Sequence, residues 1–165
     1  MEQYSRRDNV VLRGVPDSEG EVTNTLVINV AKTAGVTVTE NDLSTSHRMG
    51  KPQPNKTRPI IARFVRRDLR THLLRNKKKL KDAKDEVMKN VMVGEHLSPG
   101  RAKLLQVVKK GETIDKVWTI DGNIHCTTRD DGKKHVIGSP HDLFKRLGWG
   151  EDKLKKSGLF VDIYE

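Results

Sequence analysis

The chain has 165 residues, a formal net charge of +10 and one cysteine. Cys126 alone cannot form an intramolecular disulfide or a four-cysteine zinc cluster, so a disulfide-stapled secreted scaffold is excluded and a reducing compartment is indicated. There is no 18-residue apolar run and no charged-then-apolar leader, so we expect neither a transmembrane helix nor a secretory signal. The length is sufficient for one core of ordinary size or two small ones.

The positive charge is concentrated in one part of the chain. Residues 46–84 hold fourteen lysines and arginines against Asp68 and Asp82, a larger surplus than that of the whole chain. A polyanion would therefore be drawn to one region of the surface, and nucleic acid is the leading partner class. A solvated basic face, an anionic membrane and an acidic protein are the alternatives.

The first half of the chain alternates between strand and helix patterns. Short apolar runs with period two predict strands, and apolar spacing of three and four residues predicts helices. The predicted elements are, in order, a strand at 9–15, a helix at 21–35, a weak strand at 42–49, a loop at 50–57, a strand at 58–65, a helix at 67–80 and a strand at 87–93. This order is the ferredoxin-like βαββαβ plan.

The second half predicts a small α/β unit. A helix at 97–110 begins with Ser98 as N-cap and Pro99 as the first helical residue. Two strands flank Asp121-Gly122, a two-residue hairpin signal, and a turn at 130–132 leads into a third strand, which completes a meander. A short helix follows at 142–147. Residues 148–165 lack an assignable period, and the end of the chain, GLFVDIYE at 158–165, is either an added strand or a frayed tail.

No residue pattern indicates catalysis, a metal site or a cofactor. The six histidines are scattered, and none has a cysteine or glutamate partner at metal-ligand spacing. His125 and Cys126 are neighbours in a predicted strand, so their side chains point to opposite faces and do not form a thiol–base pair. We therefore expect a protein that is not an enzyme, with Cys126 in the core.

Several segments together resemble a known family. In chain order, the segments are RRDNVVLRGVPD, TSHRMGKP, RPIIARF, the basic helix, and VMVGEHLSPGRAKLL followed by KVWTIDGNI. They resemble the RNA-binding half of the first open-reading-frame protein of LINE-class non-LTR retrotransposons. The resemblance spans about residues 5–147. A baculoviral structural protein family has a similar C-terminal region, so the source stays open.

The resemblance implies an α+β fold with an RNA-recognition motif (RRM) at 9–95 and a C-terminal nucleic-acid-binding domain at 96–148. Residues 1–8 would be a residual linker from an upstream coiled coil that is not in this chain and through which family members self-associate, and 149–165 a tail. The implied function is single-stranded RNA and DNA binding with low sequence specificity and nucleic-acid chaperone activity, coating the element's RNA for retrotransposition. The implied location is cytoplasmic ribonucleoprotein particles, with an additional nuclear location considered and no membrane partner expected.

The candidate nucleic-acid-binding residues come from two sources. The resemblance carries over Arg6, Arg7, Asn9, Arg48, Arg63, Arg75, Lys77, Lys78, Lys79, Arg101 and Lys103. The basic segment and the strand pattern add Arg13 and Lys51, and Trp118 is the best base-stacking platform. Long cationic side chains can reach and neutralise the phosphates of a nucleic-acid backbone.

Three features of the sequence have an alternative interpretation. Trp118 could be a core residue, Arg70 a solvated helix residue and KKKLK at 77–81 a nuclear localisation run. We expect Arg48 and Arg63 on the open face of the sheet.

The sequence departs from ordinary RRMs in one respect. Those domains stack bases on aromatic residues of their first and third strands, whereas NVVLRGV has none and Phe64 is expected in the core. Arg13 and Arg63 would occupy the open face instead, which favours weak sequence preference. The missing aromatics also motivate an alternative function, a protein–protein adaptor or particle-assembly module with a basic face for an acidic partner.

Overall fold

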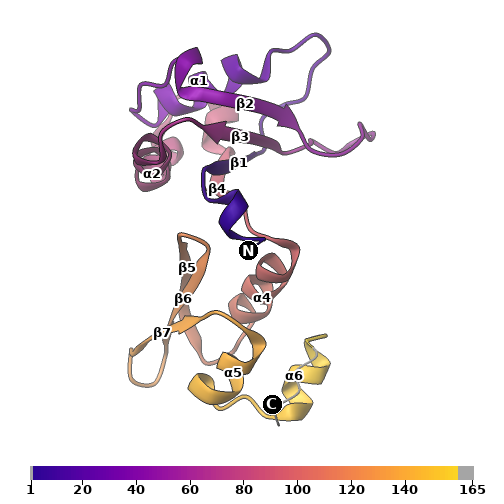
Figure 1. The fold of residues 1–165 in the computed structure, drawn as a ribbon, viewed down its shortest axis with the longest axis vertical. Coiled ribbons are helices and arrows are strands. Elements are labelled where there is room, and N and C mark those ends of the chain that lie inside the picture. The colour runs from indigo at the N-terminus through magenta and orange to yellow at the C-terminus, as the bar shows by residue number, and fades with distance from the viewer. Residues whose placement is uncertain (1, 160–165) are drawn as a thin grey trace. The chain divides into compact units, whose positions relative to one another are not determined.

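The computed structural model describes residues 2–159 of the chain, which fold into two compact units (Figure 1). The first unit spans Gln3–His96, and the second begins at Leu97. Each unit combines helices with its own antiparallel sheet, so the expected α+β class is confirmed. His96, the last residue of the first unit, contacts Arg6 and Asn9 through its side chain.

The first unit contains a four-stranded antiparallel sheet in the order β2-β3-β1-β4. Its strands are β1 (Asn9–Arg13), β2 (Leu43–Arg48), β3 (Ile60–Phe64) and β4 (Met92–Glu95), and its helices are α1 (Thr23–Thr33), α2 (Arg67–Asn76) and α3 (Glu86–Lys89), with the 3-10 helices η1 (Tyr4–Arg6), η2 (Glu40–Asp42) and η3 (Lys77–Asp82). The central strands β1 and β3 are the most apolar segments, as their buried positions require.

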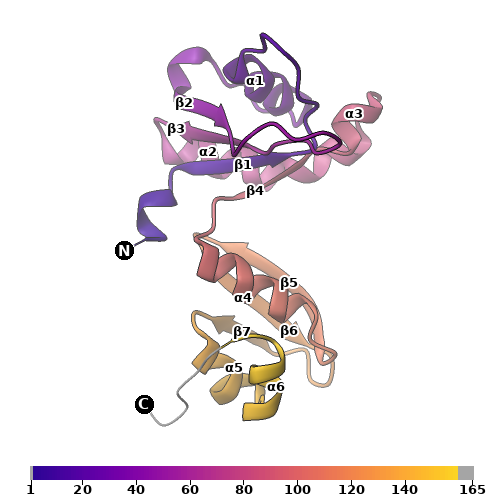
Figure 2. The same cartoon turned by 90° about the vertical axis from the view of Figure 1, so that its right-hand side faces the viewer.

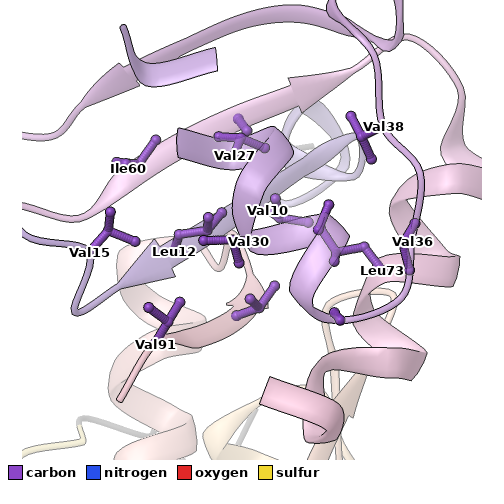
Figure 3. Close-up of a cluster of buried hydrophobic side chains, with 14 of the residues drawn as sticks. Val10, Leu12, Val15, Val27, Val30, Val36, Val38, Ile60, Leu73 and Val91 are labelled. Carbon is purple, nitrogen blue, oxygen red and sulfur yellow. The ribbon is translucent and has the colours of Figure 1, made fainter. Parts of the chain in front are cut away.

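One face of this sheet packs against helices. Alternate strand residues such as Leu12 and Ile60 point to that face, where they meet Val30 of α1 and Leu73 of α2 (Figure 3). Phe64 of β3 belongs to the same cluster. All five are at most 2% exposed. Burial of each such side chain contributes about 1.5–3 kcal/mol, so this cluster is the main source of the unit's stability.

Two predicted elements of the first unit differ from the structure. The helix expected at 67–80 ends as an α-helix at Asn76 and continues as η3, which still buries Leu80. The strand expected at 87–93 was wrong in its bounds, because Asp85 caps α3 through the Val87 amide and the strand begins only at Met92. A valine and methionine run resembles a strand, but the N-cap decided the local structure.

The second unit contains a three-stranded meander in the order β5-β6-β7 (Figure 2). Its strands are β5 (Ile114–Ile120), β6 (Asn123–Thr128) and β7 (Lys134–Ile137), and its helices are α4 (Pro99–Lys109), α5 (Pro140–Leu147) and α6 (Glu151–Lys156). The predicted hairpin is confirmed: Asp121 and Gly122 have φ of 50° and 78°, the positive values of its two-residue turn. Ser98 caps α4 as expected, accepting from the Arg101 amide.

The segment after α5 belongs to the second core. Trp149, Leu154 and Leu159 are each at most 7% exposed and join Leu104 and Ile124 in one cluster. Residues 149–159 are therefore packed, where the sequence had indicated a tail; α6 is only six residues long, too short for its periodicity to be recognised. The added strand or frayed tail considered for the end of the chain falls partly on 160–165, outside the described residues.

Candidate nucleic-acid interface

The second face of the four-stranded sheet, which we call the sheet face, lies opposite the face against which α1 and α2 pack. Its side chains are those between the core-facing ones, since successive strand residues point to opposite faces. The register places Asn9 opposite Arg63 and Val11 opposite Ile61. The members of the sheet face are Asn9, Val11, Arg13, Thr45, His47, Ile61, Arg63, Met92 and Gly94. None of them belongs to the buried cluster of this unit.

Arg13 and Arg63 are the two strong cations of the sheet face. Both are exposed, and neither side chain forms an ion pair or hydrogen bond among residues 2–159. No sheet-face member is acidic or carries a Phe, Tyr or Trp ring. Phe64 is 2% exposed and lies in the core, as expected. The sheet face therefore offers guanidinium groups, which bind phosphates and stack on bases. It offers no Phe, Tyr or Trp ring on which a base could stack.

Arg6, Arg7 and Asn9 lie in a small cluster beside the start of β1. Nη1 of Arg6 lies 2.6 Å from Nε2 of His96, and Nδ2 of Asn9 lies 3.1 Å from Nδ1 of the same ring. The guanidinium of Arg7 stacks on Tyr4, with its carbon 3.4 Å from the ring centroid. Burial, and secondly the charge of Arg6, lower the pKa of His96, so the neutral ring is favoured. His96 was not among the sequence candidates, because its partners are about ninety residues away in the chain.

Arg48 is not on the sheet face, which corrects its predicted position. It pairs with Ile60 across β2 and β3, and Ile60 faces the core. Its side chain is 4% exposed; Nε donates to Glu21 Oε1 at 2.6 Å, and Nη1 donates to the carbonyl of Val15 at 2.8 Å. The same hydrogen bond lowers the pKa of Glu21. Arg48 therefore has a structural role, which we call the clasp role: its side chain holds the β1–α1 loop against β2.

The long β2–β3 loop brings Lys51 to the surface. Lys51 is exposed, whereas Arg58, in the same loop, forms an ion pair with Asp17 at 2.6 Å. A hollow of about 870 Å³ is lined by this loop and by residues 16–21. Of its three carboxylates, Asp17 and Glu21 are paired with arginines, and Glu19 is exposed to solvent.

The remaining basic candidates of the first unit lie on its helical layer. Arg75 of α2 and Lys77, Lys78 and Lys79 of η3 are all exposed. Arg70 differs from them, being 3% exposed, with its guanidinium bonded to Glu95 at 3.1 Å and to the Asn9 carbonyl. The alternative of a solvated Arg70 is therefore wrong.

Two candidates of the second unit hold structure together. Arg101 donates to the carbonyl of Gly122 at 2.8 Å, which fastens α4 to the tip of the β5–β6 hairpin. Lys103 donates to the carbonyl of Gly158 at 2.6 Å and so holds the segment after α6. Both side chains have backbone partners in their own unit.

Trp118 lies on the open face of the three-stranded sheet. It pairs with His125 across β5 and β6, and the two rings stack with centroids 5.7 Å apart and 16° between their planes. Trp118 is half-buried and outside the second core, so the alternative that it is a core residue is wrong. Lys116 and Lys134 share this face by register and are exposed. These three neighbours of Trp118 were missed, because strand pairing is not visible in a linear sequence.

The described residues contain no group of three histidine, cysteine or acidic side chains that could hold a metal ion. Cys126 is fully buried, and burial raises the pKa of its thiol. Among residues 2–159, none of the helices has the length and apolar character needed to cross a membrane. The candidate binding groups described above are therefore exposed cations and the stacked Trp118–His125 pair.

Comparison of the chain with models of known families and with curated proteins finds no match.

Proposed function

We propose that this protein binds single-stranded RNA and DNA with low sequence specificity. The observation that carries the proposal is the sheet face, where Arg13 and Arg63 are exposed and unpaired among the described residues and no carboxylate lies beside them. Guanidinium groups bind the phosphates common to all sequences, and backbone contacts carry no base information. Binding through such a face is therefore tolerant of sequence.

The first unit is proposed to be an RRM. The βαββαβ element order, the strand order β2-β3-β1-β4 and a sheet with one helix-free face support this assignment. RRMs bind single strands on that face of the sheet. In this chain arginines would replace the stacking aromatics, which favours phosphate contacts over base readout.

The second unit is proposed to supply the base-stacking platform. Trp118 and His125 form a flat pair, and Lys116 and Lys134 flank it on the same face. Stacking on an aromatic ring is available to every base, and adjacent lysines attract the phosphates. Because Arg101 and Lys103 are bonded to backbone carbonyls, their role in this proposal is to position the unit.

The biological role we propose follows the resemblance to LINE-class proteins. The chain would coat the transcript of a retrotransposon in a ribonucleoprotein particle and act as a nucleic-acid chaperone. It would work without catalytic chemistry and without a cofactor. Self-association through a coiled coil outside this chain, and a cytoplasmic location of the particles, belong to the same proposal.

The proposal is tested by fluorescence anisotropy with a labelled mixed-sequence single-stranded RNA, the matching DNA and the duplex, each over a salt series. Each phosphate contact contributes about −0.7 to the slope of log K against log salt on single strands. We expect similar affinity for RNA and DNA single strands, weaker duplex binding and a slope equivalent to several contacts. Absence of binding at low salt would contradict the proposal.

A protein–protein adaptor is the second candidate, favoured by the absence of Phe, Tyr and Trp from the sheet face. An acidic peptide could pair with Arg13 and Arg63 as readily as a phosphate chain. A pull-down that captures the same partner after nuclease digestion would favour this function.

A further inference from the structure

A second basic surface lies on the helical layer of the first unit. We call Arg75, Lys77, Lys78, Lys79 and Lys81 the helix-layer cluster. All five side chains are exposed on the end of α2 and on η3. Lys32, in the last turn of α1, adds a further exposed cation to this layer, where Lys79 lies against Gly35 just after α1.

Few carboxylates neutralise this surface. The cluster's own segment contains only Asp82, while the next two acids are engaged at α3, where Asp85 caps the helix and Glu86 pairs with Lys89. Five arginines of the basic segment form ion pairs within the first unit: Arg48, Arg58, Arg66, Arg67 and Arg70. Arg75, Lys78, Lys79 and Lys81 of the cluster therefore keep a large share of the segment's charge at the surface.

The core separates the helix-layer cluster from the sheet face. Leu80 of η3 is 1% exposed and packs in the same cluster as Leu12 and Phe64, which point away from Arg13 and Arg63. A helix is about 10 Å across, so the helical layer and the sheet lie between the two basic surfaces. A short oligonucleotide seated on the sheet face would leave the helix-layer cluster open.

We propose that the helix-layer cluster binds a second nucleic-acid strand while the sheet face holds the first. One chain would then bring two strands together, with their mutual repulsion screened by cations on each side of the unit. This inference rests on the proposed function and specifies how it would promote annealing. An anionic membrane is the competing occupant of the same lysines.

The test counts bound strands with an oligonucleotide of about six nucleotides, within the usual site size for single-strand binders. Native mass spectrometry of the whole chain gives the number of equivalents, and fluorescence energy transfer between two labelled complementary strands gives the annealing rate. The test variant is Lys77→Gln/Lys78→Gln/Lys79→Gln/Lys81→Gln. The matched control removes the same charge from exposed lysines of the second unit, as Lys109→Gln/Lys110→Gln/Lys145→Gln/Lys156→Gln.

We expect the test variant to bind one equivalent fewer than wild type and the control, with the affinity of the remaining strand within about threefold and annealing slowed about tenfold or more. An equal number of equivalents and unchanged annealing would overturn the inference while leaving single-strand binding intact. Wild type that binds no strand at all would overturn the proposed function as well. Loss of retention on phosphatidylserine vesicles, with the count of strands unchanged, would assign the lysines to a membrane surface and contradict the proposal.

Discussion

Asn9 and Arg63 lie directly opposite each other in the β1–β3 ladder, and this pairing fixes which side chains reach the sheet face. Because residues alternate along a strand, the same register places Arg13 with Arg63 on the sheet face and turns Phe64 into the core. A shift of β3 by one residue along β1 would turn Arg63 into the core and expose Phe64. The apolar alternation of Ile60, Ala62 and Phe64 is thus what gives the sheet its cationic surface.

Trp118 is expected to contribute to binding and little to folding. Loss of one stacking platform costs about 1–3 kcal/mol, so Trp118→Ala should weaken single-strand binding by about tenfold. Trp118→Phe keeps a ring on the same face and should recover most of the affinity. Anisotropy measures the binding, and thermal unfolding should be almost unchanged because Trp118 lies outside the second core. Equal affinity of Trp118→Ala and wild type would show that bases do not stack on Trp118.

Arg48 is expected to act through stability. Arg48→Met leaves the carboxylate of Glu21, whose side chain is 10% exposed, without its cation. Breaking a buried ion pair from one side costs about 3 kcal/mol or more, which should appear as a lower urea midpoint. The double variant Arg48→Met/Glu21→Met also removes the unpaired carboxylate and should recover part of the lost stability. If Arg48→Met lowered RNA affinity at unchanged stability, the clasp role would be wrong.

His96 should make the stability of the first unit dependent on pH. Its pKa is lower in the folded chain than the ordinary 6.5, because burial and Arg6 disfavour the charged ring. The unfolded chain then binds more protons, so stability is retained above about pH 6.5 and falls as the pH drops below that value. His96→Gln should lose less stability than wild type between about pH 7.5 and about pH 5.5. If wild type and His96→Gln lost the same amount of stability between the two pH values, this assignment would be contradicted.

Gly111 packs against the second core, where there is no room for a side chain. A Cβ there would lie 2.9 Å from the Trp149 ring and 2.9 Å from Cγ1 of Ile114. Gly111→Ala should therefore destabilise the chain by about 1–3 kcal/mol. Gly100→Ala is the matched control, since a Cβ at that position of α4 meets nothing within 4 Å. Thermal unfolding compares the two variants. Equal unfolding midpoints would contradict the expectation and show that the second core can accommodate a methyl group at residue 111.

Local chemistry made much of the fold predictable from the sequence. The apolar alternation of residues 60–64, the Ser98 cap and the Asp121-Gly122 turn each specify structure within a few residues, and each was confirmed. The bounds of β4 and the existence of α6 were missed because a cap and tertiary packing override short patterns.

The site was harder to predict because it depends on contacts between distant residues. Arg13 and Arg63 could be placed from strand alternation alone, and the structure agrees with that placement. The burial of Arg48 depends on Glu21 and on three backbone carbonyls, and the setting of Trp118 depends on β6 and β7. No linear pattern distinguishes a cation with such partners from one without them.

The central claim is that the sheet face binds single strands through Arg13 and Arg63. Its most direct test is the salt dependence of single-stranded RNA binding by Arg13→Gln/Arg63→Gln, measured beside Lys109→Gln/Lys110→Gln, which removes the same charge from exposed residues of the second unit. We predict that the arginine variant binds at least about tenfold more weakly, with a log–log slope smaller by about 1.4 for two lost phosphate contacts. Thermal unfolding should match wild type. Equal affinity and slope in the two variants would contradict the account.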